Sequence, residues 1–277
     1  MSLDEDRSDL RIIHVIGVKD IPLIKPGDDL GLLICEAARS QGTPLMNGDV
    51  VVVSQKIVSK AEGRIVSLKS VKPRDFAYKV AKLTKKPPQY IELALQEARS
   101  LIRVMKNHFI TETKLGWIYP YSGVDLSNVS NMDEATLLPI DPDHSAHKIR
   151  MRIKELTNCD VAVIISDTTG RPFRRGYVNV AIGISGISPI LDLRGKNDIF
   201  GRRLRVKMIA IADELASAAE LIMGNADERI PVAIVRGYRY QIDEGASARL
   251  IQRPKEKDLF IGSWVQVEGL EHKVKPS

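Results

Sequence analysis

The sequence predicts an α+β protein with mixed or antiparallel sheets and flanking helices. Two observations support this prediction. Apolar runs with strand spacing and helix spacing alternate irregularly along the chain, and no repeat with a period of about 20 to 50 residues is present. A regular alternation would instead indicate a doubly wound sheet. The 277 residues, 44% of them hydrophobic and 27% charged, are enough for one large domain or two modest ones.

Two strands are predicted near the start of the chain. The first covers residues 11–18 (RIIHVIGV); a turn with proline and glycine follows, and Asp28 or Asp29 can cap a helix that begins near Leu30. The second, 49–54 (DVVVVS), is β-branched and is therefore expected to be buried. It runs into SQKIVSKAEGR, which we expect to be a polar, cationic loop.

The next part of the chain is predicted to supply scaffold. Helical spacing of apolar residues covers 74–84 and 88–104, with two prolines between them. Residues 109–121 are expected to be extended, and the turn SGVDLSNVSN follows. A helix is then predicted from about Asp143 to Thr157.

The strongest strand signal in the chain is at 160–167 (DVAVIISD). Its last residue opens a long predicted loop, DTTGRPFRRG, before the apolar run 177–187. A strand-like segment from Leu204 leads to an amphipathic helix that ends at Gly224, and a further strand is expected at 231–237.

Composition excludes several classes of protein. No apolar run approaches the roughly 20 residues that cross a bilayer, and the first ten residues are acidic and polar, unlike a signal peptide, so we expect a cytoplasmic protein. Cys35 and Cys159 lie far apart and form no CxxC motif, so both are expected to be reduced, structural thiols.

The chain is basic, with a net charge of +6 and a pI of about 9.2. Such a charge fits a nucleic-acid binder and also an enzyme that gathers phosphate-bearing substrates. The basic residues are spread along the chain and aromatic residues make up 5%, which leaves few rings to stack on bases. We therefore expect no nucleic-acid partner.

The predicted strand 160–167 ends in a carboxylate, Asp167, which is followed by Arg171, Arg174 and Arg175. A carboxylate at a rigid strand end can bind a divalent cation, and guanidinium groups bind phosphate or carboxylate oxygens. Two structural alternatives remain open: Asp167 can cap the turn DTTG, and the arginines can pair with acidic neighbours on a solvated loop.

Cationic side chains follow the other buried strand. Gln55, Lys56, Lys60 and Arg64 lie in SQKIVSKAEGR, where lysine ammonium groups can offset the charge of a triphosphate. The alternative is an ordinary surface loop.

The turn SGVDLSNVSN contains Asp125 and Asn128, a possible second metal ligand and a partner for nucleotide oxygens, although an Asx turn explains the same letters. No GxxxxGK[ST] or GxGxxG motif is present, so any nucleotide is held without a P-loop or a Rossmann turn. His144 and His147 lack a third ligand at diagnostic spacing and are expected to be exposed.

Seven segments together, in order, resemble the coenzyme F420-0:L-glutamate ligase family, also called F420-0 gamma-glutamyl ligases. The resemblance covers residues 12–240, and KAEGR, DTTGRPFRRG and AIGISG are its most specific parts. The segments are IPLIKPGDDL, SQKIVSKAEGR, GVDLSN, DPDHSAHKIRMRI, SDTTGRPFRRG, AIGISG and MGNADERIPVAIVRG.

The resemblance implies one ligase unit, residues 11–252, built from two intertwined α+β subdomains, with polar terminal segments at 1–10 and 253–277. It also implies a homodimer, GTP as phosphoryl donor, and two Mn²⁺ or Mg²⁺ ions, with K⁺ as a further candidate. The implied reaction joins L-glutamate by its amino group to the terminal carboxylate of coenzyme F420-0.

Residue roles also follow from the resemblance. The implied metal ligands are Asp125, Asp167 and Thr168. The implied nucleotide contacts are Gln55, Lys56, Lys60, Asn128 and the backbone of Ile21, Pro22, Leu23 and Ile24. The sequence departs from the family pattern at one ligand position, where Asn225 replaces the acidic residue or glutamine of MGE or MGQ. Asparagine is shorter and neutral, so it holds a cation less tightly, and Asp227 is a nearby substitute.

Our own hypothesis for the mechanism passes through an acyl phosphate, because a carboxylate must be activated before an amine can attack it. Metals on Asp125 and Asp167 would bridge the phosphates, and Lys56 and Lys60 would offset their charge. Arg171, Arg174 or Arg175 would orient substrate carboxylates. Three alternatives stay open: a ligase of the same fold with another acceptor, a metal-dependent phosphohydrolase, and a nucleotide-binding protein without catalysis.

Overall fold

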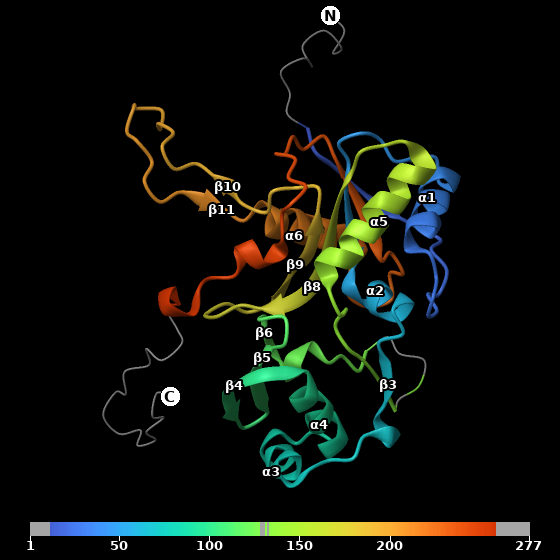
Figure 1. The fold of residues 1–277 in the computed structure, drawn as a ribbon, viewed down its shortest axis with the longest axis vertical. Coiled ribbons are helices and arrows are strands. Elements are labelled where there is room, and N and C mark those ends of the chain that lie inside the picture. The colour runs from blue at the N-terminus through green and yellow to red at the C-terminus, as the bar shows by residue number, and fades with distance from the viewer. Residues whose placement is uncertain (1–11, 128–130, 132, 259–277) are drawn as a thin grey trace, which may run out of the picture.

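A five-stranded mixed sheet forms the centre of the molecule (Figure 1). The structure, a computed structural model, describes residues 12–127, 131 and 133–258. The strand order is β1-β12-β2-β8-β9, with β2 and β8 parallel and the other pairs antiparallel. The strands are β1 (His14–Val18), β2 (Val50–Ser54), β8 (Ala162–Gly170), β9 (Tyr177–Ser185) and β12 (Val232–Arg236). The mixed sheet confirms the predicted α+β class.

Helices cover both faces of this sheet. The first face carries α1 (Leu30–Ser40), α2 (Gln55–Ala61) and α5 (Pro142–Thr157), and the opposite face carries α6 (Ile211–Met223). Val51 and Val53 of β2 pack on the first face and Val50 and Val52 on the second. The strand is therefore buried on both sides, which explains its unbroken run of valines.

A smaller α+β part, residues 65–138, is inserted between α2 and α5 and lies at the bottom of Figure 1. It has its own apolar cluster, which includes Val80, Ile91 and Phe109. Trp117 and Tyr119 reach from it into the central core. Its elements are β3 (Ile65–Ser67), α3 (Asp75–Thr84), α4 (Pro88–Glu97), β4 (Ala98–Met105), β5 (His108–Thr113), β6 (Ile118–Pro120) and β7 (Glu134–Thr136).

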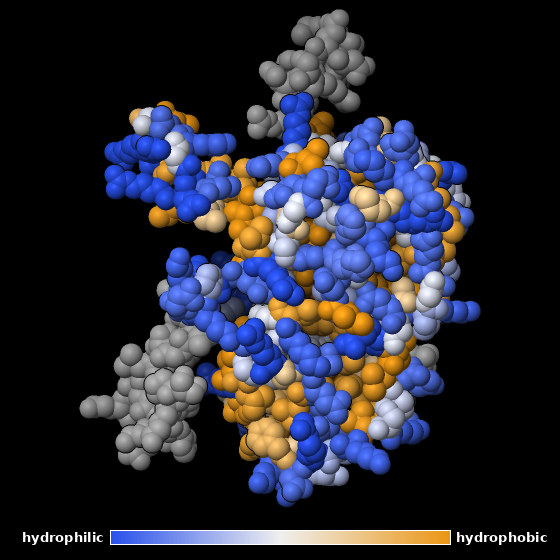
Figure 2. All heavy atoms as spheres, viewed as in Figure 1, coloured by the Kyte–Doolittle hydropathy of each residue, from blue (hydrophilic) through white to orange (hydrophobic). Residues whose placement is uncertain are grey.

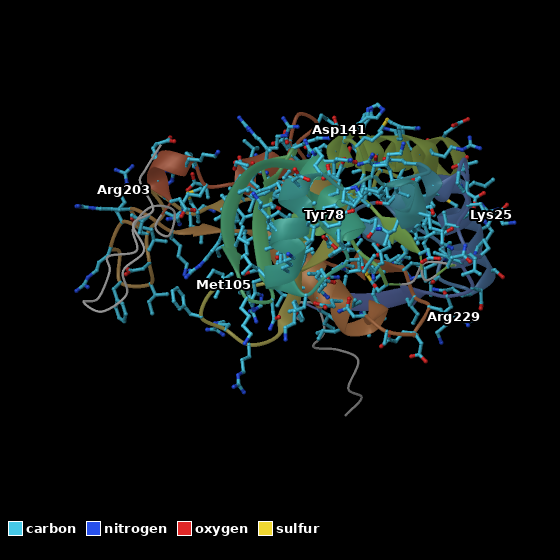
Figure 3. All side chains as sticks on the ribbon, turned by 90° about the horizontal axis from the view of Figure 1, so that it is seen from below. Lys25, Tyr78, Met105, Asp141, Arg203 and Arg229 are labelled. Carbon is cyan, nitrogen blue, oxygen red and sulfur yellow. The ribbon has the colours of Figure 1, made fainter. Side chains whose placement is uncertain are left out.

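A hairpin built on β10 (Leu191–Asp192) and β11 (Met208–Ile209) projects from the body. Figure 2 shows that it is mostly hydrophilic, yet Ile199, Phe200 and Val206 are exposed on it. Arg203, which Figure 3 labels on this hairpin, lies well away from Asp141 on the main body. Only β11 forms in the region where the sequence predicts a strand from Leu204, because the preceding residues belong to the hairpin.

Several predicted elements are confirmed. Asp29 caps α1, since its carboxylate accepts a hydrogen bond from Leu32 N at 3.0 Å. The helix predicted over 143–157 is α5, and α6 ends at Gly224 as expected. His144 and His147 are exposed. Within the described residues no helix is long and apolar enough to span a membrane.

Three further predictions were wrong, because contacts made in the folded chain override the local signal. The loop expected after β2 is the helix α2, capped by Ser54 and packed through Ile57 and Val58. The helix predicted over 88–104 ends at Glu97, because the residues after it pair with β5. The loop expected after Asp167 begins later, because β8 continues to Gly170 in a hairpin with β9.

Gly183 on β9 lets the start of α5 lie against the sheet. A Cβ at this position would be 2.4 Å from the carbonyl carbon and oxygen of Pro142, which are backbone atoms that cannot turn aside. We expect Gly183→Ala to lower the free energy of unfolding by about 1–3 kcal/mol, as overpacking does elsewhere. Urea unfolding measures this. Gly245→Ala is the control, since its Cβ would meet nothing closer than 3.8 Å; equal losses in the two variants would contradict the prediction.

Candidate functional site

The site lies where β2 ends and its parallel pairing with β8 stops. Ser54 pairs with Ser166, so the residues that follow each strand lie side by side. Lys56 follows β2 in the first turn of α2, and Asp167 follows Ser166 along β8. Carboxyl ends of neighbouring parallel strands commonly form ligand sites, because polar side chains from both strands meet there.

A third group comes from the smaller part. The backbone of Asp125 is bonded in both directions to Thr136, at 2.9 and 2.8 Å. Lys56 spans the two parts, because its Nζ lies 2.9 Å from Asp125 Oδ2 and donates to Ser127 Oγ at 2.7 Å. The structure thus brings Lys56, Asp125 and Asp167 into one electrostatic cluster, as the sequence predicts.

The two carboxylates respond differently to this environment. Burial opposes ionisation of Asp125, but the Lys56 ammonium and the hydrogen bonds from Ser127 outweigh it, so the pKa lies below its ordinary value. Burial raises the pKa of Asp167 to about 6, and the Thr168 N–H and the Tyr119 hydroxyl only partly offset this. A positive charge placed next to Asp167 would therefore strongly stabilise its ionised form.

Lys60 lies one helical turn after Lys56. Burial lowers its pKa, and the positive charge of Lys56 lowers it further, while Asp125 acts in the opposite direction. Two ammonium groups held this close favour an anion with several charges. Gln55 has a different environment, since its side chain is buried, 2% exposed, and accepts a hydrogen bond from Ser59 at 2.9 Å.

Neutral oxygens lie next to Asp167. The Thr168 hydroxyl oxygen is 2.9 Å from Asn179 Oδ1 and 2.9 Å from Asn225 Oδ1. Asn179 belongs to β9, opposite Thr168 in the hairpin, and Asn225 follows the end of α6. These oxygens come from three separate segments.

The donor set fits a hard divalent cation. Asp125, Asp167, Thr168 and Asn225 offer oxygen ligands only, which Mg²⁺ and Mn²⁺ prefer. Among the described residues no three His, Cys, Asp or Glu side chains gather as a metal cage, so water or substrate phosphates would have to supply further ligands. Lys56 already places a positive charge against Asp125.

Comparison with known proteins places the chain among ligases. The profile of the F420-0:Gamma-glutamyl ligase family matches residues 18–237. The chain belongs to this family. It is 45% identical over 251 residues to the coenzyme F420:L-glutamate ligase of Methanothermobacter thermautotrophicus, covering 90% of this chain and 99% of that protein. The enzyme of the same name from Methanocaldococcus jannaschii is 44% identical over 252 residues, covering 90% and 97%.

Other candidate residues from the sequence lie apart from this cluster or outside the described residues. Arg171, Arg174 and Arg175 are exposed at the tip of the β8–β9 hairpin. Arg171 also lines a cavity of about 500 Å³ beside Asp213 of α6. Asn128 lies outside the described residues. In the segment that precedes α1, Ile24 is buried, Ile21 is half-buried, Pro22 is exposed and Leu23 is 85% exposed.

Sequence reasoning missed two side chains that lie in this cluster. The buried Tyr119 hydroxyl faces Asp167, and Asn179 contributes an oxygen beside Thr168. Tyr119 belongs to a short strand with no motif around it, so nothing local reveals it. Asn179 interrupts the otherwise apolar run YVNVAIGIS, and a polar residue in a buried strand is the signal that could have found it.

Proposed function

We propose that this protein joins L-glutamate by its amino group to the terminal carboxylate of coenzyme F420-0, with GTP as the phosphoryl donor. The match to enzymes named coenzyme F420:L-glutamate ligase over 90% of the chain is the observation that carries the proposal. The cluster of Lys56, Lys60, Asp125 and Asp167 supports it, because it combines sites for phosphate oxygens and for a cation.

The proposed reaction has two steps. A carboxylate oxygen of F420-0 attacks the γ-phosphorus of GTP, GDP leaves, and an acyl phosphate forms. The glutamate nitrogen then attacks the acyl carbon, phosphate leaves, and the nitrogen loses a proton as the amide forms. Activation is needed because a free carboxylate is a poor acyl donor.

The side chains of the site have distinct tasks in this proposal. Asp125, Asp167, Thr168 and Asn225 would hold Mn²⁺ or Mg²⁺, which supplies charge neutralisation on the phosphates. Lys56 and Lys60 would bind phosphate oxygens directly. Arg171, which lines the cavity beside α6, is the arginine best placed to orient a substrate carboxylate.

The direct test measures phosphate release from GTP with Mn²⁺, with and without F420-0 and L-glutamate, followed by mass spectrometry of the acceptor. The proposal expects phosphate release that needs both substrates and a mass gain of one or more glutamyl units. Phosphate release that is indifferent to both substrates would contradict it and indicate a phosphohydrolase. Replacing GTP by ATP in the same assay tests the nucleotide preference.

Lys60 is expected to serve the nucleotide more than the fold. Lys60→Met should raise the KM for GTP by roughly 10- to 100-fold, because a half-buried ammonium beside the phosphates is lost. It should not lower thermal stability, since burial disfavours this charge. Steady-state kinetics and a melting curve separate the two effects. Lys148→Met, on the exposed side of α5, is the control, and an unchanged KM in Lys60→Met would contradict the assigned role.

We also propose a homodimer. The exposed Ile199, Phe200 and Val206 on the projecting hairpin support this, because apolar side chains gathered on an extension are typical of protein contacts. Light scattering after size-exclusion chromatography gives the mass directly. A monomer at micromolar concentration would contradict it.

A further inference from the structure

Helix α6 runs along β9, the edge strand of the central sheet, and replaces a neighbouring strand. Asp213 Oδ1 accepts from Ala181 N at 2.9 Å, Ser217 Oγ donates to the Asn179 carbonyl at 2.8 Å, and Glu220 Oε2 accepts from Asn179 N at 2.8 Å. The spacing of four and three residues places these side chains on one face of the helix. Two of them only satisfy the strand backbone, but Glu220 does more.

The carboxylate of Glu220 uses both of its oxygens. Oε2 accepts from the β9 backbone, and Oε1 accepts from the side-chain amide nitrogen of Asn225. This second hydrogen bond fixes the orientation of the Asn225 side-chain amide. Its nitrogen points to Glu220, so its oxygen points to Thr168.

Three oxygens, those of the Thr168 hydroxyl and of the Asn179 and Asn225 amides, share a single hydrogen that can be donated between them. The Thr168 hydroxyl lies 2.9 Å from both Asn179 Oδ1 and Asn225 Oδ1, but it carries one hydrogen and can donate to only one of them. The other pair is an oxygen against an oxygen. A cation held by the Thr168 and Asn225 oxygens would remove the need for this hydrogen, because both oxygens would then face positive charge.

We propose that Glu220 is a positioning residue for a cation site at Thr168 and Asn225. It holds the Asn225 amide so that oxygen, and not nitrogen, faces the cation. This inference rests on the proposed function, in which Asn225 and Thr168 hold a divalent cation. Glu220 acts through Asn225, because its Oε1 accepts from the Asn225 amide while its Oε2 accepts from the β9 backbone.

Glu220→Gln is the informative variant because it keeps the shape and removes one acceptor. A glutamine that still accepts from Asn179 N must turn its NH₂ group towards Asn225. Asn225 then has to turn its oxygen to Gln and its nitrogen to Thr168, and the cation loses a ligand. Loss of such an orienting partner typically weakens metal binding about 10- to 100-fold.

The test titrates the full protein with Mn²⁺ alone and follows free Mn²⁺ by electron paramagnetic resonance. We expect the parent protein to bind two ions and Glu220→Gln to bind one of them about 10- to 100-fold more weakly. Glu214→Gln removes the same charge from an exposed position of the same helix and should bind Mn²⁺ like the parent. Circular dichroism confirms that each variant is folded.

A double variant provides the rescue. In Glu220→Gln with Asn225→Asp, the new aspartate accepts from the glutamine NH₂ with one oxygen and presents its other oxygen to Thr168. Mn²⁺ affinity should therefore return towards that of the parent. Failure of this rescue, equal affinity in Glu220→Gln and the parent, or a single Mn²⁺ site in the parent would each overturn the inference.

The outcome is separable from that of the proposed function. Mn²⁺ binding that depends on Glu220 in a protein without ligase activity would sustain the inference and reject the proposed function. Ligase activity with the same Mn²⁺ dependence in the parent and in Glu220→Gln would sustain the proposed function and reject the inference about Glu220.

Discussion

Asp167→Asn is expected to abolish ligase turnover and, at the same time, to stabilise the metal-free protein. The loss of turnover should be on the order of 10²- to 10³-fold or more, because the neutral amide cannot neutralise the charge of a cation at the phosphates. Burial raises the pKa of Asp167 to about 6, so its ionised form is disfavoured in the folded protein. Replacing Asp167 by asparagine therefore removes the free-energy penalty of burying this negative charge.

The stability change has a definite pH dependence. The folded pKa lies above the ordinary aspartate value, so the folded state binds this proton more tightly than the unfolded chain does. Stability of the parent therefore falls as pH rises from about 4 to about 6, and the full cost, at most roughly 3 kcal/mol, is present above pH 6. Asp167→Asn should gain most at pH 7 to 8 and nothing near pH 4.

Melting curves at several pH values, without metal, measure this effect. Asp213→Asn is the matched control for stability, because burial also raises the pKa of Asp213, which is not one of the proposed metal ligands. It should also be more stable than the parent at pH 7. Full turnover in Asp167→Asn, or a stability difference that does not change with pH, would contradict the prediction.

The sequence predicts a feature well when the residues that determine it are close together in the chain. The Asp29 cap and the buried run before Asp167 depend on neighbours within a few residues, so both were predicted correctly. Residues 98–105 form a strand because they pair with β5. The helical spacing of this stretch, taken alone, does not reveal that partner. Local spacing therefore identified most elements but misjudged where some of them end.

The same limit applies to the site. Lys56 and Asp125 are 69 residues apart in number yet form an ion pair at 2.9 Å, and the family motifs flagged both. Glu220 has helical spacing that looks like an ordinary amphipathic helix, and its bond to Asn179 spans 41 residues. A side chain that orients a ligand leaves no motif of its own, so only the fold shows it.

Arg236→Met should cause the largest loss of stability among these variants. Arg236 binds Asp49 through Nε at 2.8 Å and through Nη2 at 2.7 Å, and Asp49 is only 1% exposed. After the change, the buried carboxylate keeps the Met46 N–H but loses its countercharge. Breaking a buried ion pair from one side costs about 3–5 kcal/mol, which urea unfolding at pH 7 measures.

The partner variant separates the countercharge from the packing. Adding Asp49→Asn to Arg236→Met removes the stranded charge, so the double variant should be more stable than Arg236→Met alone, against the usual expectation that losses add. Asp49 precedes β2, whereas the site lies at the other end of that strand, so turnover per folded molecule should stay unchanged in both variants. A double variant less stable than Arg236→Met would show that the lost hydrogen bonds, and not the unpaired charge, dominate at this end of the sheet.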